Sequence, residues 1–398
     1  MSEMVKLKDI VDLQNGYAFK SNDYVKLSNT LSCRMSNIRP DGKFDLEYNS
    51  RYLPDNFSDK YKNYILKDGD LIIAMTDLAN DPKILGVPVL VNTKGKNVLQ
   101  NQRVGKIVLK NDNIFIPYLM RALSTKRARD FYKKFSNGGL QINIGKKEIL
   151  ENTIPLPTLT KQKKIANTLD KANELITLRK ESIKKLDELS KSIFIDMFGD
   201  PVLNLKKWKT IKLSKLGHCK NGLNYDSKEN KYKIKCLGVR DFKNLTIVDD
   251  IESLQIISVD KQPAVEYLLQ NKDLVFVRSN GSKELVGRCV EVYPNEEKVT
   301  FGGFCIRFRL SSDLVIVSYL LNVLTCKSMR QKMLGRGANI QNLNQQILNE
   351  LDIPLPPKPL QNKFATIVEK IEEQKALYEK ELKLLEDNFN SLLQKSFS

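Results

Sequence analysis

Two long segments of the chain place apolar residues at alternating steps of four and three. These segments, residues 162–198 and 361–397, contain neither Pro nor Gly. Such spacing puts apolar side chains on one face of an α-helix and is typical of a heptad seam, which needs a partner helix. We therefore predict two long helices with packed seams. The predicted seam residues are Ile165, Leu169, Ile176, Ile183, Leu186, Ile193, Phe364, Val368, Ile371, Tyr378, Leu382, Leu385 and Leu392.

A charged residue interrupts each seam. Arg179 and Lys375 stand at seam positions, where such a residue either fixes the register or lies with its aliphatic stem across the apolar face. The simplest partner for each helix is the other helix of the same chain. Two equivalent helices related by a pseudo-twofold axis then run antiparallel and form a rod with a globular domain near each end. A parallel homodimer is the alternative.

The rest of the chain has short apolar runs separated by Gly, Asn, Asp and Pro. "DLIIAM" and "DLVFVR" are typical of short buried strands, and a few amphipathic stretches indicate helices among them. We predict an α+β protein with two mixed α/β globular domains separated by the long helices. The predicted boundaries are 1–153 for the first globular domain, 154–199 for the first long helix, 200–352 for the second globular domain and 353–398 for the second long helix.

The sequence is internally duplicated. "IPLPTLTKQKKIA" from residue 154 is repeated as "IPLPPKPLQNKFA" from residue 353, and "KLKDIVDLQNGYAF" from residue 6 as "KLSKLGHCKNGLNY" from residue 212. Between them, "YILKDGDLIIAM" matches "YLLQNKDLVFVR", and "NGGLQINI" matches "RGANIQNL". Because the repeat extends in both directions with small offsets, it predicts two copies of one structural unit.

The charge balance indicates the kind of partner. The chain of 398 residues has 65 Lys and Arg against 47 Asp and Glu, a net charge of +18. An excess of this size favours a nucleic acid over the substrates of an ordinary basic enzyme. The two helical segments are nearly neutral, so almost all of the excess lies in the globular domains. Two basic domains of different sequence, held apart, suit a DNA duplex that is read at two unlike half-sites.

Cysteine usage and hydropathy indicate where the chain works. The six cysteines form no C-x-x-C pair and no regular spacing, which favours reduced thiols in a cytosolic protein. The N-terminal segment lacks the apolar stretch of a signal peptide, and "LVIVSYLLNVL" is too short to span a bilayer. We therefore expect a soluble, cytoplasmic protein that has no membrane partner.

Several blocks of the sequence resemble the specificity (S) subunits of type I restriction-modification systems. The resemblance covers nearly the whole chain. It is most specific in "IPLPTLTKQKKIANTLDKANELI" and "IPLPPKPLQNKFATIVEKIEEQK", and in "DLIIAMTDLANDPKILGVPVLV" and "DLVFVRSNGSKELVGRCVEV". It implies that each globular domain is a target recognition domain and that the helices form an intramolecular antiparallel coiled coil.

The resemblance also implies a non-catalytic subunit of a restriction system, present in one copy per complex. Such a subunit binds double-stranded DNA at a bipartite, asymmetric site. It directs two methyltransferase (modification) subunits and the endonuclease/translocase subunits to that site for DNA methylation and cleavage. The chain itself would bind no cofactor, and S-adenosylmethionine, ATP and Mg would bind to the partner subunits.

The residues agree that catalysis resides elsewhere. No Pro-Pro is preceded by Asn or Asp, as an adenine methyltransferase motif requires, because the only Pro-Pro is Pro356-Pro357. "GLQINIGKK" is one residue too long for a phosphate-binding loop and ends in Lys where a magnesium-binding hydroxyl belongs. The single histidine, His218, leaves no room for a histidine metal cluster. We therefore predict neither catalytic nor metal-binding residues.

Loops between the apolar runs are the expected base-contacting segments. Arg, Asn, Gln, Ser and Thr side chains match the groove edges of bases, whereas phosphate contacts supply affinity. The candidates in the first domain are Tyr17, Lys20, Ser21, Asn22, Arg34, Arg39, Thr76, Asp77, Asn137, Gln141 and Asn143. The candidates at matching places in the second domain are Asn224, Tyr225, Lys228, Arg240, Arg278, Ser279, Asn280, Lys283, Arg336, Asn339 and Gln341.

Ordinary structural roles compete with these assignments. Asn15-Gly16 and Asn221-Gly222 are typical of turns, and Tyr17 and Tyr225 fit the edge of a core as well as the stacking face for a base. "STKRARDFYKKF" and "TCKSMRQKML" predict basic helices whose side chains bind phosphate or are simply solvated. Because both copies are basic, we favour phosphate.

Two other functions stay open at this point. The chain could be a self-sufficient DNA-modifying enzyme whose motifs are not recognisable, or a stand-alone DNA-binding regulator or scaffold. The first predicts methylation or cleavage by the purified chain alone. The second predicts binding that does not depend on the sequence of either half-site.

Overall fold

The computed structural model describes residues 3–135, 140–225, 232–242, 246–282, 284–334 and 342–397. The chain divides into two compact units, which we describe one at a time. Unit 1 comprises residues 1–179 and 381–398, and unit 2 comprises residues 180–380. The divisions fall inside the two long helices, α6 (Leu159–Phe198) and α10 (Lys358–Phe397). Each unit therefore contains a globular part and a segment of both helices.

The globular part of unit 1 is built on two four-stranded sheets. One has the order β2-β10-β6-β8 with antiparallel neighbours, and the other has the order β4-β3-β9-β5 with a parallel β3–β9 pair. The pairs β1–β12 and β7–β11 lie outside these sheets. The strands are β1 Met4–Lys6, β2 Val11–Asn15, β3 Thr30–Cys33, β4 Tyr52–Leu53, β5 Ile65–Leu66, β6 Leu71–Ala74, β7 Thr76–Leu78, β8 Pro88–Leu90, β9 Asn97–Gln100, β10 Val104–Leu109, β11 Gln141–Asn143 and β12 Thr153–Pro155. The helices are α1 Leu7–Ile10, α2 Phe57–Lys60, α3 Ile116–Ser124, α4 Lys126–Lys133 and α5 Lys146–Leu150.

Unit 2 repeats this plan with one more strand in the first sheet and one fewer in the second. Its sheets have the orders β14-β21-β18-β19-β16 and β17-β15-β20, and β13 pairs with β22. The strands are β13 Thr210–Lys212, β14 Gly217–Asn221, β15 Tyr232–Leu237, β16 Ile247–Val248, β17 Gln255–Val259, β18 Asp273–Val277, β19 Cys289–Val292, β20 Val299–Phe301, β21 Cys305–Leu310 and β22 Asp352–Pro354. The helices are α7 Val317–Thr325, α8 Lys327–Leu334 and α9 Gln345–Asn349.

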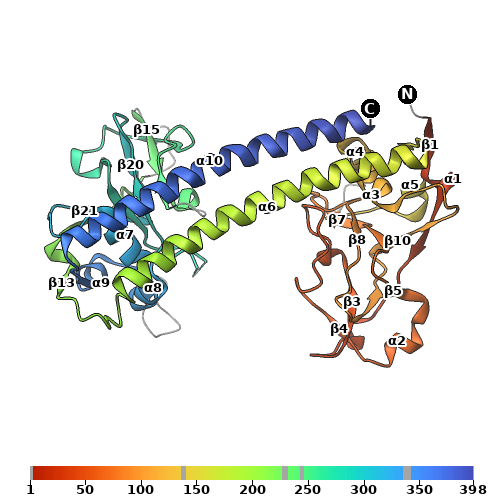
Figure 1. The fold of residues 1–398 in the computed structure, drawn as a ribbon, viewed down its shortest axis with the longest axis horizontal. Coiled ribbons are helices and arrows are strands. Elements are labelled where there is room, and N and C mark those ends of the chain that lie inside the picture. The colour runs from red at the N-terminus through yellow and green to blue at the C-terminus, as the bar shows by residue number, and fades with distance from the viewer. Residues whose placement is uncertain are drawn as a thin grey trace. The chain divides into compact units, whose positions relative to one another are not determined.

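The two units share one topology, which confirms the internal repeat. Strands β2, β10, β6 and β8 of unit 1 correspond in order and pairing to β14, β21, β18 and β19 of unit 2. The parallel β3–β9 pair corresponds to the parallel β15–β20 pair. Helices α3, α4 and α5 follow these strands in unit 1, as α7, α8 and α9 do in unit 2 (Figure 1).

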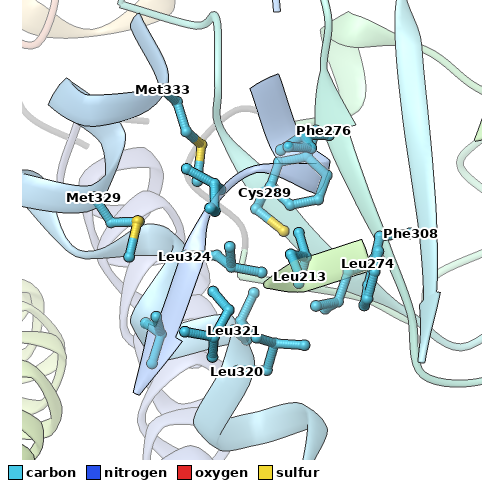
Figure 2. Close-up of a cluster of buried hydrophobic side chains, with 14 of the residues drawn as sticks. Leu213, Leu274, Phe276, Cys289, Phe308, Leu320, Leu321, Leu324, Met329 and Met333 are labelled. Carbon is cyan, nitrogen blue, oxygen red and sulfur yellow. The ribbon is translucent and has the colours of Figure 1, made fainter. Parts of the chain in front are cut away.

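Each core forms where the central strand meets the helices. All residues of β6 and β18 are buried, because both faces of these strands are covered, and this explains their uninterrupted apolar sequences. In unit 2, Leu274 and Phe276 of β18 pack in one cluster with Leu320 and Leu324 of α7 and Met329 of α8 (Figure 2). The cluster extends to Phe194, Phe198 and Phe364 of the long helices. The helices are thus anchored in the core and not attached to its surface.

Within each unit, the segments of α6 and α10 run antiparallel. In unit 1, Arg179 pairs with Glu381 at 2.9 Å, and the start of α6 lies in the same core as Phe397 at the end of α10. In unit 2, Lys375 pairs with Asp187 at 2.7 Å, and the ring of Phe194 lies 5.6 Å from that of Phe364. Rising residue numbers on α6 therefore meet falling numbers on α10, as the antiparallel prediction requires.

Four of the predicted seam residues are buried in the structure. Leu169, Ile176, Phe364 and Ile371 are buried. Partly buried seam residues complete the face, namely Ile165, Ile183, Leu186, Ile193, Val368, Tyr378, Leu382 and Leu385.

Leu392 corrects the predicted seam, because it is 37% exposed. Its neighbour Leu393 packs against the core of unit 1 instead, with Phe389 and Phe397. In the other copy, Phe194 is 3% exposed and is the tightly packed residue next to Ile193. The last contacts step by four residues, as the 3.6-residue period of a straight helix favours, so the heptad count drifts by one position.

A buried amide attaches each long helix to its globular part. Gln162 and Gln361, at equivalent places, are 1% and 0% exposed. The side chain of Gln162 accepts a hydrogen bond from one backbone N–H and donates to two backbone carbonyls, all at 2.9 Å. Gln361 makes the equivalent bonds at 2.9 to 3.0 Å. Since unpaired buried amide groups are costly, each glutamine fixes where its helix leaves the domain.

Among the described residues, no helix is both long enough and apolar enough to cross a membrane.

Candidate nucleic-acid interface

One turn in unit 1 gathers several of the predicted DNA-contacting segments. This turn, residues 101–104, connects β9 to β10 and is closed by a hydrogen bond from Val104 N to Asn101 O at 3.0 Å. Gln102 N donates to Tyr17 O at 2.9 Å, and Met75 N donates to Arg103 O at 3.0 Å. The ends of β2 and β6 therefore lie directly beside the turn. We call residues 15–17, 75–77 and 101–104 the turn frame of unit 1.

Gly16 allows this close approach. A Cβ atom at this position would lie 2.2 Å from the carbonyl oxygen of Asn101, so only glycine fits. The equivalent Gly222 has the same property, since a Cβ there would lie 2.1 Å from Gly302 O. The Asn-Gly pairs were expected to form turns. They serve instead as points of close backbone contact with a turn formed by other residues.

Unit 2 builds the same frame. Cys305 N donates to Gly302 O, and Arg278 N donates to Phe304 O, both at 2.8 Å. Leu223 N donates to Phe301 O at 2.8 Å. The turn frame of unit 2 consists of residues 221–225, 278–280 and 302–305. It contains the predicted residues Asn224, Tyr225, Arg278, Ser279 and Asn280.

Thr76 and Asp77 lie in the frame of unit 1 but are 3% and 6% exposed. The hydroxyl of Thr76 donates to Oδ1 of Asn143 at 2.7 Å. The carboxylate of Asp77 accepts the backbone N–H groups of Leu78, Ile84 and Leu85. We therefore correct the expectation of direct base contact for these two residues, because their polar atoms organise the β7–β8 loop and the β11 strand.

The basic helices α4 and α8 are also partly structural. The guanidinium of Arg129 donates to Lys83 O at 2.6 Å, and the equivalent Arg330 donates to Glu284 O at 2.8 Å. Burial lowers the pKa of both guanidinium groups. Each thus supports the loop that precedes β8 or β19. The outer residues, such as Lys126, whose side chain is 92% exposed and lies 3.3 Å from Asp130, stay candidates for phosphate contact.

Other predicted residues of unit 1 lie on its surface around the frame. Lys20, Ser21, Asn22, Gln141 and Asn143 are exposed.

Three further candidates of unit 1 are partly buried. Tyr17 belongs to an aromatic cluster and lies with its ring centroid 4.4 Å from that of Tyr61, which supports the interpretation as the edge of a core. Arg34 directly follows Cys33, whose carbonyl accepts the N–H of Asn101 in the turn. Arg39 stacks 3.5 Å above the ring of Tyr48.

None of the described candidates of unit 2 is buried. Asn224 and Arg240 are exposed, and Tyr225 is 43% exposed. Burial of the Tyr225 hydroxyl raises its pKa, helped by the neighbouring Cys236. Arg278, Ser279 and Asn280 are half-buried, and the guanidinium of Arg278 makes no hydrogen bond or ion pair with any residue that the structure describes. The predicted residues Asn137, Lys228, Lys283, Arg336, Asn339 and Gln341 lie outside the described residues.

Sequence reasoning missed the turn at the centre of each frame. Gln102 is exposed, Arg103 is half-buried, and Phe304 is 67% exposed. In the sequence, Gln102 and Arg103 stand in a short polar run directly before an apolar strand, whereas Phe304 stands between a glycine and the apolar strand that follows. One signal was available in the sequence. The two copies of the repeat carry different residues, Arg103 and Phe304, at the same place directly before an apolar strand.

The other reactive side chains are not arranged for catalysis. Burial raises the pKa of the thiols of Cys33, Cys219 and Cys236 to about 12, so they are protonated at neutral pH. In the part of the chain that the structure describes, no group of three or more His, Cys, Asp or Glu residues could hold a metal ion.

Comparison with known families adds to this geometry. Residues 1–188 and 205–387 each match the family described as "Type I restriction modification DNA specificity domain". The chain belongs to this family. The two matches cover the two halves of the internal repeat, so each unit contains most of one specificity domain.

Specificity domains of this kind also occur in the similar proteins. The MjaVIII specificity subunit of Methanocaldococcus jannaschii is 30% identical over 194 residues, which are 48% of this chain and 44% of that protein. The StySPI specificity subunit of Salmonella potsdam is 26% identical over 61% of this chain and 55% of that protein. These alignments span about half the length of each relative. The putative MjaX specificity subunit of Methanocaldococcus jannaschii is 24% identical over 97% of this chain and 87% of that protein.

Solved structures of the specificity-subunit type share the fold. The crystal structure of a type I restriction-modification S subunit from M. genitalium has a TM-score of 0.55 and 17% identity over 100% of this chain and 96% of that chain. A structure described in terms of complex assembly and conformational transition of the type I R-M system has a TM-score of 0.56 and 16% identity, over 99% of this chain and 97% of that chain.

Proposed function

We propose that this chain is the sequence-specific DNA-binding subunit of a type I restriction-modification complex. It acts in the cytoplasm on a bipartite, asymmetric site in double-stranded DNA, and each unit contacts one half-site. It performs no catalysis itself. One copy directs two methyltransferase subunits and the endonuclease/translocase subunits to the site.

One observation carries the proposal: two units in one chain hold the same backbone frame but present different side chains around it. Around the turn, unit 1 presents Gln102 and Arg103, whereas unit 2 presents Phe304, Tyr225 and Arg278. Equal frames indicate equal tasks, and unequal side chains indicate unequal sequences to be recognised. A protein that binds DNA without preference gains nothing from this difference.

The long helices supply surfaces for the partner subunits. Several leucine and isoleucine side chains on α6 and α10 lie off the packed face and are about half exposed. In unit 1 they are Leu175 (53%), Leu178 (51%) and Leu384 (56%), and in unit 2 they are Leu189 (47%), Ile195 (43%) and Leu377 (50%). Apolar residues in such number on a charged helix surface are typical of protein contacts. They are the docking positions that we propose for the methyltransferase subunits.

We propose that S-adenosylmethionine, ATP and Mg bind to the partner subunits and not to this chain. The sequence lacks the phosphate-binding loop that ATP requires and the Asn-Pro-Pro-Tyr-like motif of adenine methylation. The purified chain incubated with duplex DNA and all three cofactors is therefore expected to leave the DNA unmodified. Methylation or cleavage by the chain alone would identify it as an enzyme.

The decisive experiment maps methylated adenines across the host genome in cells with the chain and in cells from which it is deleted. We expect a bipartite motif with a fixed gap to be methylated only when the chain is present. The full-length chain with one unit exchanged for that of a relative is expected to change one half of the motif. A change in both halves, or an unchanged methylation pattern after deletion, would contradict the proposal.

A further inference from the structure

The turns at the centre of the two frames have equivalent backbones and different side chains. In both units the third residue of the turn is held through its carbonyl by the first residue after the buried central strand. Arg103 is held in this way by Met75, and Phe304 by Arg278. Each turn is closed by its own hydrogen bond between the first and fourth residues. Arg103 and Phe304 are therefore presented from the same rigid position of each unit.

Phe304 is exposed although its neighbours are not. Its side chain is 67% exposed, whereas Phe301, three residues before it, and Cys305, directly after it, are fully buried. Tyr225, 43% exposed, lies beside the turn, and a Cβ at Gly302 would lie 3.9 Å from its ring. An apolar ring held in water by a rigid turn, next to a second exposed ring, is typical of a binding surface.

Arg103 is available for a ligand. Its guanidinium makes no hydrogen bond or ion pair with any residue in the described ranges. Its backbone is fixed, because its N–H also donates to Oδ1 of Asn101 at 3.2 Å. A guanidinium on a fixed backbone can direct two parallel N–H groups at one acceptor pair, such as O6 and N7 of guanine.

The comparison of the two turns decides between base and phosphate. Arg103 alone could neutralise a phosphate. Phe304 at the equivalent position cannot, since it has neither charge nor donor, whereas a phenyl ring packs well against the methyl group of thymine. If equivalent positions have equivalent tasks, the shared task is contact with base edges.

We propose that the third residue of this turn is a specificity-determining residue in each unit. Arg103 contacts a guanine edge in one half-site, and Phe304 contacts a thymine methyl group in the other. This inference rests on the proposed function, because it assigns bases to the two frames of a bipartite reader.

The test uses the full-length chain, purified together with its partner subunits, and a pool of duplexes randomised over both half-sites. We expect Arg103→Ala to reduce the preference for guanine about 10- to 100-fold at one position of one half-site only. Phe304→Ala is expected to reduce the preference for thymine about 5- to 10-fold at one position of the other half-site. Arg103→Phe is expected to replace the guanine preference with one for thymine.

Matched controls separate base contact from charge and hydrophobicity. Arg51→Ala removes the same charge from an exposed place in unit 1, and Val265→Ala trims a side chain that is 73% exposed in unit 2. Neither should change base preference, and circular dichroism confirms that all variants fold.

Two results would overturn the inference while leaving the proposed function intact. One is uniform weakening by Arg103→Ala with unchanged base preference and a salt dependence reduced by about one phosphate. The other is unchanged selection by both alanine variants. If the unsubstituted complex selects no bipartite sequence, the proposed function fails, and this inference fails with it.

Discussion

Unit 1 and unit 2 share the backbone contacts that hold their frames and differ in the side chains around them. Both place a glycine, Gly16 or Gly222, against a turn, and both fix a long helix with a buried glutamine. Around these shared elements the chemistry diverges. Unit 1 surrounds its frame with an aromatic cluster that includes Tyr17 and Tyr61, whereas unit 2 has Tyr225, 43% exposed, beside its turn.

This difference shows which positions of a duplicated unit tolerate substitution. The frame is held by backbone hydrogen bonds and by the absence of a side chain, so it constrains few residue types. Its exposed side chains, such as those of Gln102 and Phe304, take no part in these bonds and can be exchanged without losing the fold. One chain can therefore contain two copies of the same fold that present different side chains to a ligand.

The largest expected effect is the loss of one frame by Gly16→Ala. The added Cβ would lie 2.2 Å from Asn101 O, so β2 must move away from the turn. We expect unit 1 to lose about 3 kcal/mol of unfolding free energy, measured by chemical denaturation, with hydrogen exchange locating the loss. Gly222→Ala is expected to do the same to unit 2.

Gly281→Ala is the matched control, because a Cβ there meets no atom within 4 Å. It should leave stability within about 0.5 kcal/mol of the unsubstituted chain. A stable Gly16→Ala variant would show that the close approach does not hold the frame together.

A smaller effect is expected where the ends of the long helices meet the cores. Leu393→Ala should destabilise unit 1 by about 2 kcal/mol, since this partly buried side chain packs against the core. Leu392→Ala should change stability by less than about 0.5 kcal/mol, because that side chain is 37% exposed. Thermal unfolding of the two variants measures which of the two leucines packs. If Leu392→Ala were the more destabilising substitution, the heptad assignment made from the sequence would be correct.

The smallest expected effect concerns a buried carboxylate of unit 2 whose equivalent residue in unit 1 is apolar. Glu291 is 5% exposed on β19, at a place where unit 1 has Leu90, and accepts a hydrogen bond from the Tyr293 hydroxyl at 2.6 Å. Burial raises the pKa of Glu291. Ionisation at neutral pH therefore opposes folding, and this penalty disappears as the pH falls below the pKa of the unfolded chain, about 4.3.

Glu291→Gln should accordingly stabilise unit 2 by about 1 kcal/mol at pH 7 and by almost nothing near pH 4. Glutamine keeps an acceptor for Tyr293, so the hydrogen bond is not the variable. Glu296→Gln at an exposed place nearby should show no such pH dependence. A Glu291→Gln variant that is less stable than the unsubstituted chain at neutral pH would show that the carboxylate is favourable where it lies.

Much of the fold could be predicted because it depends on periodic or repeated patterns. The long helices follow from the spacing of residues such as Leu169 and Ile371. The duplicated topology and the antiparallel pairing of the helices follow from the matching blocks of the repeat. The candidate site was harder. Tyr225 and Arg278 were predicted as candidates because they stand in polar loops, and the structure places both in the frame of unit 2. Asp77 was assigned wrongly to the surface because a sequence does not show that a loop folds back over its own carboxylate.

The sequence by itself determined the repeat, the two helices, the basic globular parts and the absence of recognisable catalytic motifs, because each of these depends on local spacing or on composition. Only the tertiary structure decided that Gly16 and Gly222 serve close contact, that Leu393 and not Leu392 packs, and that Arg103 and Phe304 occupy equivalent exposed places. The physical reason is that these facts depend on which backbone segments approach one another. Hydrogen bonds between distant strands set that approach. The type of a residue and its place in the sequence do not show which distant segment it bonds to.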